Sequence, residues 1–165
     1  MKKNQKGFSL IELLIVVAII LIIAAIAIPN LLRSKMAANE ASAVGSVRTI
    51  VTSEVTFNST WDIGYAANLG VLGGASPCTA SSTTACLIDP VLSAGAKSGY
   101  NFAAPGGAAV GGIVPTFAVS AVPQQVGSTG QRAFCSDESG VVRYDPTGAT
   151  AAATDTACQA LTVLQ

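Results

Sequence analysis

The side chains of this sequence that could do chemistry are few. The chain contains four cysteines and no histidine. Without histidine it lacks the commonest general base and the usual activating partner of a nucleophilic serine or cysteine. The cysteines do not form a C-x-x-C pattern, which disfavours a zinc or thiol redox site; they are Cys78, Cys86, Cys135 and Cys158. We therefore expect no catalytic residues, no metal, no cofactor and no enzymatic activity.

Other patterns that could bind or transform a ligand are also weak. The glycine-rich stretch 106–112 contains neither a dinucleotide-binding motif nor a P-loop, so no nucleotide binding is expected. Asp137 and Glu138 could contact calcium, but their spacing is not that of an EF-hand loop, and a solvated turn is the better interpretation. The formal net charge is zero, which gives no reason to expect nucleic acid as a partner.

The most distinctive segment is an apolar run, Phe8–Ile28, in which Ser9 and Glu12 are the only polar residues. As a helix at about 1.5 Å per residue it would extend roughly 32 Å, enough to cross a hydrocarbon core of about 30 Å. A buried core helix is the alternative, but the length of the run and its basic flank disfavour it. That flank, which is Lys2, Lys3 and Lys6, is expected to stay cytoplasmic and to direct the rest of the chain outward.

Glu12 is the one charge inside this run, and a carboxylate there needs a partner. An acid at the middle of a membrane helix costs about 2.5–3.5 kcal/mol, and less near its end. Cleavage before Phe8 would create an α-amino group about one helical turn upstream. Glu12 could then pair with its own terminus or with that of an adjacent molecule. The intermolecular pair would fix the axial register between copies, so the residues alone predict self-association.

A conventional secretory signal peptide is a second interpretation of this segment. Ala25-Ile26-Ala27 fits a cleavage site of the A-x-A type and would give a mature start at Ile28. Pro29 would lie just past that cut, and a discarded apolar region gains nothing from Glu12. Both features disfavour the signal peptide, and with it a secreted binding domain.

The residues at the start of the chain resemble a known signature. Lys6-Gly7-Phe8-Ser9-Leu10-Ile11-Glu12-Leu13, followed by Leu14–Ile28 and Pro29, is similar to the prepilin motif of type IV pilins and type II secretion pseudopilins. The resemblance is close from Met1 to about Phe57 and looser beyond. It implies that a prepilin peptidase cleaves between Gly7 and Phe8 and methylates the Phe8 amine. It also implies that Glu12 neutralises the Phe8 amine of a neighbouring subunit during assembly.

The resemblance also implies partners and a location. The precursor would wait in the inner membrane with its head outside the cytoplasm, and would then join identical subunits in an extracellular filament. A cytoplasmic ATPase acting through a membrane platform protein would drive this step. The helix would bend at Pro29, because proline lacks an amide hydrogen and clashes with the preceding turn; alternatively, Pro29 would simply start a second helix.

The segment after Pro29 has the pattern of an amphipathic helix. Apolar residues recur at spacings of three, four or seven, which predicts one face that needs cover. Charged and polar residues are expected off that face. The apolar residues are Leu32, Met36, Ala43, Val47, Ile50 and Phe57, and the polar ones are Arg33, Lys35, Asn39, Glu40 and Arg48.

The rest of the chain predicts a small antiparallel sheet of about four strands that covers this helix. Residues 60–98 look like a loop, and Asp137–Gly140 looks like a hairpin turn. The expected strands are Tyr100–Ala103, Thr116–Val122, Ala133–Ser136 and Val141–Tyr144. The expected fold is therefore α+β, a pilin fold, with a leader at 1–7, a membrane and filament-core helix at 8–29, an amphipathic helix at 30–58 and a head at 59–165.

Four cysteines on the exported side of a membrane favour two disulfides. Three pairings are possible in principle. Proximity in the sequence favours Cys78 with Cys86 and Cys135 with Cys158, and the second pair would join the carboxy-terminal segment to the sheet, as in many pilins.

The leading functional prediction is a type IV pilus subunit, most like a major subunit, that serves adhesion, twitching motility or DNA uptake. A pseudopilin of a type II secretion system is the alternative. The secreted binding domain is the second alternative.

Overall fold

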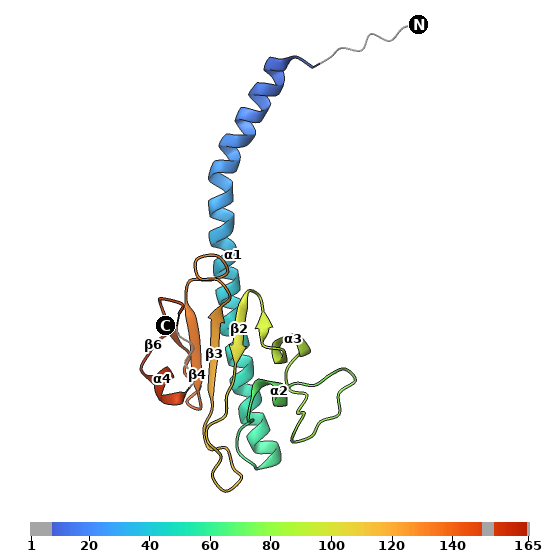
Figure 1. The fold of residues 1–165 in the computed structure, drawn as a ribbon, viewed down its shortest axis with the longest axis vertical. Coiled ribbons are helices and arrows are strands. Elements are labelled where there is room, and N and C mark those ends of the chain that lie inside the picture. The colour runs from blue at the N-terminus through green and yellow to red at the C-terminus, as the bar shows by residue number, and fades with distance from the viewer. Residues whose placement is uncertain (1–7, 150–153, 165) are drawn as a thin grey trace. The chain divides into compact units, whose positions relative to one another are not determined.

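The computed structural model describes residues 8–149 and 154–164, and the predicted leader, residues 1–7, lies outside the described residues. The chain divides into two compact units, Met1–Lys35 and Met36–Gln165. Helix α1, Leu10–Trp61, belongs to both (Figure 1).

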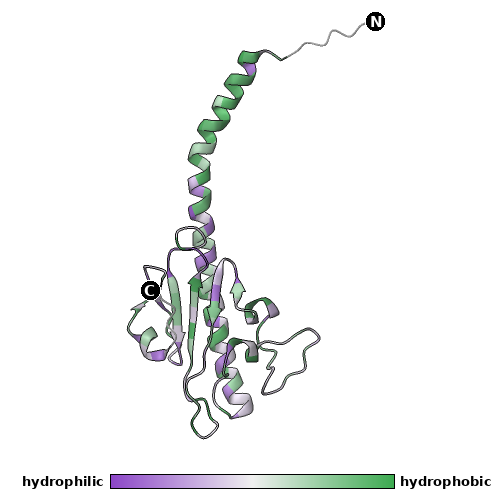
Figure 2. Cartoon of the chain, in the orientation of Figure 1, coloured by the Kyte–Doolittle hydropathy of each residue, from purple (hydrophilic) through white to green (hydrophobic). Residues whose placement is uncertain are grey.

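The described part of the first unit is the apolar portion of α1, which Figure 2 shows hydrophobic over nearly its whole length. Pro29 lies inside the helix, so the idea that it starts a second helix is wrong. A proline removes one backbone donor and leaves a carbonyl one turn earlier without its usual partner. For Pro29 that carbonyl is the one of Ala25, and the side-chain amide of Asn30 donates to the next carbonyl along, that of Ile26, 3.1 Å away. A bend at Pro29 stays a prediction.

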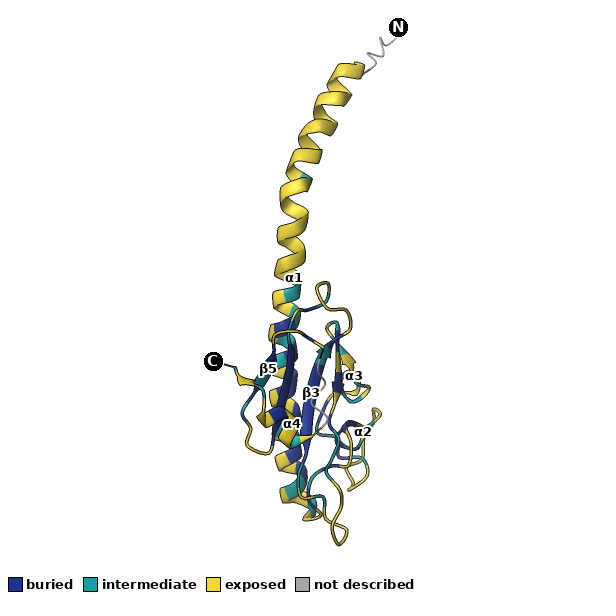
Figure 3. Cartoon of the chain, turned by 60° about the vertical axis from the view of Figure 1, so that its left-hand side comes forward, coloured by how far each residue is buried: buried dark blue, intermediate teal, exposed yellow. Residues whose placement is uncertain are grey.

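In the second unit, one face of α1 lies against the sheet, as the periodicity predicts. Ala43, Val47, Ile50 and Phe57 are at most 1% exposed. They share one core with aromatic residues from the sheet and the segments beside it, among them Tyr100, Phe102, Phe117 and Phe134. In Figure 3 the strands at the centre of this unit are buried, whereas the outward face of the helix is exposed.

Within the described residues the sheet has six antiparallel strands in sequence order, where about four were expected. The four predicted strands are present, Tyr100–Ala103 with the predicted bounds and the other three with shifted ends, and two strands of two residues each flank them. A two-residue strand has no periodicity that a sequence pattern could reveal. The strands are β1, Ala96–Lys97; β2, Tyr100–Ala103; β3, Ala118–Pro123; β4, Ala133–Asp137; β5, Arg143–Asp145; and β6, Thr162–Val163.

The segment between α1 and the sheet is more ordered than the loop predicted for it. It contains two short helices, α2, Leu69–Leu72, and α3, Pro90–Ser93. Each begins at a side-chain cap, because Asn68 accepts the Val71 N–H and Asp89 accepts the Leu92 N–H. Asn and Asp are favoured caps because their oxygens satisfy donors that the first helical turn leaves free.

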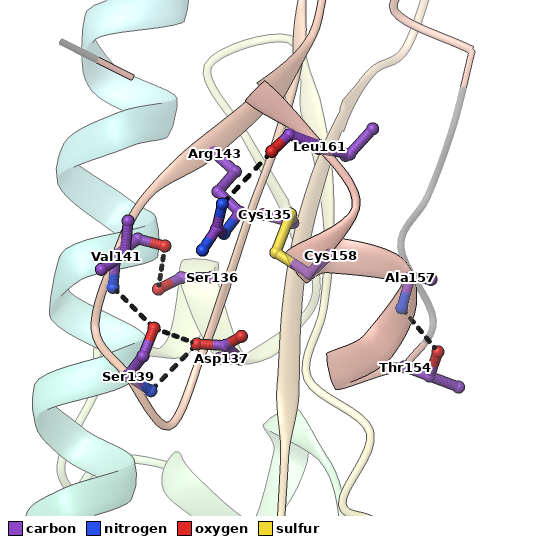
Figure 4. The surroundings of a disulfide bond; sticks show 10 residues. All are labelled: Cys135, Ser136, Asp137, Ser139, Val141, Arg143, Thr154, Ala157, Cys158 and Leu161. Atoms are coloured by element: carbon purple, nitrogen blue, oxygen red, sulfur yellow. Dashed lines mark hydrogen bonds between the residues drawn. A yellow bond between two sulfur atoms is a disulfide. The ribbon is translucent and has the colours of Figure 1, made fainter. Parts of the chain in front are cut away.

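Two disulfides link parts of the head, with the pairings that sequence proximity favours. Cys78 bonds to Cys86 across the loop before α3. Cys135 on β4 bonds to Cys158 on α4, Asp155–Gln159 (Figure 4). All five residues of β4 are buried, and α4 packs against this strand. The second disulfide therefore attaches the carboxy-terminal segment to the middle of the sheet.

The prediction that Glu40 lies off the apolar face of the helix is wrong. Glu40 lies on the buried side of α1 and is only 9% exposed. One carboxylate oxygen, Oε1, accepts the backbone N–H groups of Gln131 and Arg132 at 2.9 and 3.1 Å. The other, Oε2, accepts the Arg132 side chain at 2.9 Å from Nε and 2.7 Å from Nη2. Arg132 in turn lies over the rings of Phe134 and Tyr144. Glu40 thus ties α1 to the start of β4.

Replacing Glu40 is expected to destabilise the head. Burial raises the Glu40 pKa, but the hydrogen bonds from Gln131 and Arg132 outweigh it, so the pKa is lowered from 4.5. Ionised Glu40 therefore stabilises the fold above about pH 4.5, and this contribution is lost as the pH falls below that value. Glu40→Ala should lower the free energy of unfolding at pH 7 by about 2–3 kcal/mol, since Arg132 is partly exposed.

The Glu40 prediction is checked by urea unfolding of the full chain in detergent micelles. Glu138→Ala is the matched control, because Glu138 is exposed, and it should unfold like wild type. A Glu40→Ala protein as stable as that control would contradict the role given to Glu40.

Candidate assembly segment

The candidate site is the start of α1, where Glu12 caps its own helix. The Ser9 N–H donates to Glu12 Oε2 at 2.9 Å. The Ser9 carbonyl accepts the Leu13 N–H at 3.2 Å, so Ser9 is the residue at which the helix begins. A glutamate three positions after such a residue forms half of a capping box. The carboxylate is thereby held at the first turn, beside the backbone nitrogens that precede the helix.

This geometry leaves Glu12 able to bind a second donor. A carboxylate has about four acceptor positions on its two oxygens, and the Ser9 N–H uses one of them. Glu12 also lies at the amino end of the helix, where the partial positive charge of the helix dipole stabilises an anion. An ammonium group placed at this end would complete the pairing.

The amino-terminal part of α1, which carries Glu12, is almost entirely exposed within its own chain. Phe8 is 86% exposed, and every residue from Phe8 to Lys35 is exposed except Ala24, which is half-buried. The most apolar 18-residue window of α1 has a mean hydropathy of 3.3 and is 0% buried, and by length and composition this helix could span a membrane. Glu12 is the only ionisable side chain between Phe8 and Leu32. The segment is therefore an apolar surface with one charge at its end.

Two of the predicted site residues, Phe8 and Glu12, lie close together at the start of α1. Phe8 directly precedes Ser9, whose N–H contacts Glu12. Gly7, and with it the predicted cleavage between Gly7 and Phe8, lies outside the described residues. Pairing between Glu12 and the Phe8 amine of another molecule stays a prediction, because the structure contains one chain.

The sequence interpretation missed two residues of this segment. Ser9 is not among the predicted site residues, although Ser-x-x-Glu ahead of an apolar run is a recognisable helix start. Asn30 was not singled out, although an asparagine within a helix can donate its side-chain amide to the carbonyl four residues earlier, as Asn30 does to Ile26. Both patterns involve residues no more than four positions apart in the sequence.

Comparison with known families identifies a motif in the amino-terminal segment. Residues 2–28 match the prokaryotic N-terminal methylation motif. The match covers the basic flank, the Gly7–Phe8 junction, Glu12 and most of the apolar run. The amino-terminal segment thus carries an N-terminal methylation motif.

Two curated proteins are similar to parts of the chain. The type IV wide pilus major component PilA4 of Thermus thermophilus is 63% identical over 38 residues, 23% of this chain and 29% of that protein. The type IV major pilin protein PilA of Myxococcus xanthus is 42% identical over 59 residues, 36% of this chain and 27% of that protein. The matched parts thus span less than a third of either relative. No solved structure matches the chain. Together the motif and the relatives support the resemblance to type IV pilins.

Proposed function

We propose that this chain is the precursor of a structural subunit of a type IV pilus, which polymerises through its apolar amino-terminal helix into a surface filament. The head, with its sheet and two disulfides, forms the filament surface. Adhesion, twitching motility and DNA uptake are activities that such a filament serves. The chain has a structural role in it and performs no catalysis.

The observation that carries the proposal is the bare apolar helix with its single capped carboxylate. An apolar surface this long, exposed within its own chain, needs either lipid or other protein around it. In the precursor this helix is surrounded by membrane lipid, and in the filament it is surrounded by the same helix of other subunits. Both surroundings are apolar, so the transfer from one to the other gains little from the hydrophobic effect.

Specificity must therefore come from packing and from Glu12. A carboxylate among apolar helices is stable only when a cation meets it. Cleavage between Gly7 and Phe8 supplies that cation as the α-amino group of Phe8, and methylation leaves the amine able to carry its charge. When the amine of one subunit meets Glu12 of the next, only one axial stagger satisfies both charges.

The machinery for these steps is also part of the proposal. A prepilin peptidase cleaves and methylates the precursor in the inner membrane. An assembly ATPase and its membrane platform supply the work of extracting subunits from the bilayer, which the packing of stems does not provide. The matched motif, with its basic flank ahead of an apolar run, supports the first of these partners directly.

The test is mass spectrometry of filaments sheared from cells that express the full chain. The proposal predicts a major filament protein whose first residue is N-methylated Phe8. A mature start at Ile28, or material that is exported only as single molecules, would contradict it. Short filaments confined to the cell envelope would instead indicate the pseudopilin.

A further inference from the structure

Glu54 is a second buried acid, and neither assembly nor the Glu40 contact uses it. It lies near the end of α1 and is 0% exposed. Its Oε2 accepts the backbone N–H of Ala66 at 2.8 Å. Its Oε1 is buried and, among the residues that the structure describes, has no hydrogen-bond partner. Only one of the two carboxyl oxygens therefore accepts a hydrogen bond. Burying the group in this state is unfavourable when it carries a charge.

The hydrogen bond between Glu54 and Ala66 attaches the segment that follows α1 to the helix. The chain reverses after Trp61 through two residues with positive φ, Asp62 at 53° and Gly64 at 84°. The neighbouring backbone then pairs with Val114, whose carbonyl accepts the Tyr65 N–H at 3.0 Å. Ala66 itself is 0% exposed, and its N–H bonds to Glu54 across the reversal. Glu54 is thus the side chain that connects α1 to the stretch leading into α2.

No neighbouring charge compensates Glu54 among the described residues. The titratable side chains closest in sequence are Arg48 on α1 and Asp62 and Tyr65 in the reversal, and α2 and β3 carry none. Burial raises the Glu54 pKa from 4.5 to about 7, against the opposing hydrogen bond from Ala66. Burial and one N–H group therefore set the charge of Glu54.

The other titratable groups of the elements around this core have partners of their own. Asp89, at the start of α3, pairs with Lys97 of β1 at 3.0 Å. The Tyr100 hydroxyl on β2 donates to the Arg132 carbonyl. On β4 and β5, Asp137 accepts the Ser139 N–H, Arg143 donates to the Leu161 carbonyl, and the Tyr144 ring lies under Arg132.

We propose that Glu54 is a proton-controlled latch, which holds Ala66 and the segment leading into α2 against α1 while its carboxyl is neutral and releases them when it ionises. The neutral form tolerates the apolar surroundings and still accepts the Ala66 N–H. The ionised form gains little from one N–H group and is stabilised by water when the segment opens. The head surface built by this segment is then more firmly held in mildly acidic surroundings than in alkaline ones.

The direction follows from linkage. A carboxyl whose pKa is raised to about 7 in the folded state keeps its proton in the closed form at a pH where the opened form has lost it. The closed form is therefore favoured most below pH 4.5, and this preference declines as the pH rises through 7. From well below pH 4.5 to well above pH 7 the equilibrium constant for opening should rise by up to about 300-fold.

The test is hydrogen exchange of the Ala66 amide in the full chain in detergent micelles, at pH 5 and pH 8.5, corrected for intrinsic exchange rates. In wild type the protection of Ala66 should fall by one to two orders of magnitude at the higher pH. In Glu54→Gln, which cannot ionise, protection should change much less. Asp62→Asn is the matched control in the same reversal and should behave like wild type. Equal pH dependence in wild type and Glu54→Gln would overturn the latch.

Two further measurements test the latch in the wild-type chain and do not depend on the folding of Glu54→Gln. In wild type, Ala66 should open locally, so its exchange should respond to low urea concentrations much less than that of Val119 in the core. If the Ala66 and Val119 amides both exchange only through global unfolding, with the same dependence on urea, the latch is overturned. A carboxyl NMR titration of Glu54 should show a midpoint near 7, and a midpoint near 4.5 would overturn it as well. None of these outcomes bears on whether the chain forms filaments, so the proposed function is tested separately.

Discussion

Glu12→Ala is expected to reduce filament assembly by at least tenfold while leaving export and cleavage of the precursor intact. The substitution leaves the Phe8 amine of the neighbouring subunit buried without a counter-charge. Removing one partner of a buried ion pair typically costs about 3–5 kcal/mol, which exceeds the roughly 1.4 kcal/mol that corresponds to a tenfold change. The measurement is the quantity of sheared filament protein at equal precursor expression.

Glu12→Gln separates pairing from helix capping. The glutamine side chain keeps an oxygen that can accept the Ser9 N–H, which Glu12 binds at 2.9 Å, but it has no charge. If the charge pair drives assembly, Glu12→Gln should fail nearly as completely as Glu12→Ala. Filament yields near wild type from Glu12→Gln would mean that Glu12 serves only to cap the helix, and normal yields from Glu12→Ala would remove the registration argument altogether.

A bulky residue in place of Gly7 is expected to abolish processing. The proposed cleavage lies between Gly7 and Phe8, and a large side chain directly before that bond obstructs its approach to the peptidase. Gly7→Phe should accumulate in the membrane as uncleaved precursor, with little or no mature protein. Without cleavage no Phe8 amine exists, so filaments should be absent as well. The ratio of precursor to mature protein on an immunoblot measures the effect.

Gly7→Ala is the matched control for this experiment, because it adds a single methyl group at the same position. Appreciable cleavage of Gly7→Ala beside none in Gly7→Phe would support the assigned bond. Mature protein that starts at Phe8 in Gly7→Phe cells would contradict it.

The amino-terminal segment could be predicted well from sequence because its signals are local and one-dimensional. An apolar run, a basic flank and one acid need no knowledge of distant residues. The same holds for the hairpin at Asp137–Gly140, where Gly140 has a φ of 72° and its N–H bonds to the Asp137 carbonyl. A glycine adopts such a conformation without steric penalty.

The positions of Glu40 and Glu54 could not be predicted in the same way. Periodicity places a charged residue on the solvent side of a helix, because most charges are solvated. Glu40 is buried because Arg132, 92 residues later, supplies its partner, and Glu54 because the chain turns back to present Ala66. Both depend on long-range contacts that one helix cannot reveal. Strands β1 and β6 were missed because each has two residues.

The most direct test of the central claim is the structure of the assembled filament at side-chain resolution. We expect each Glu12 carboxylate to lie within about 4 Å of the methylated Phe8 nitrogen of an adjacent subunit, with the apolar helices packed together around the filament axis. A filament in which Glu12 contacts only its own chain, or in which the apolar helices are cleaved off, would contradict it.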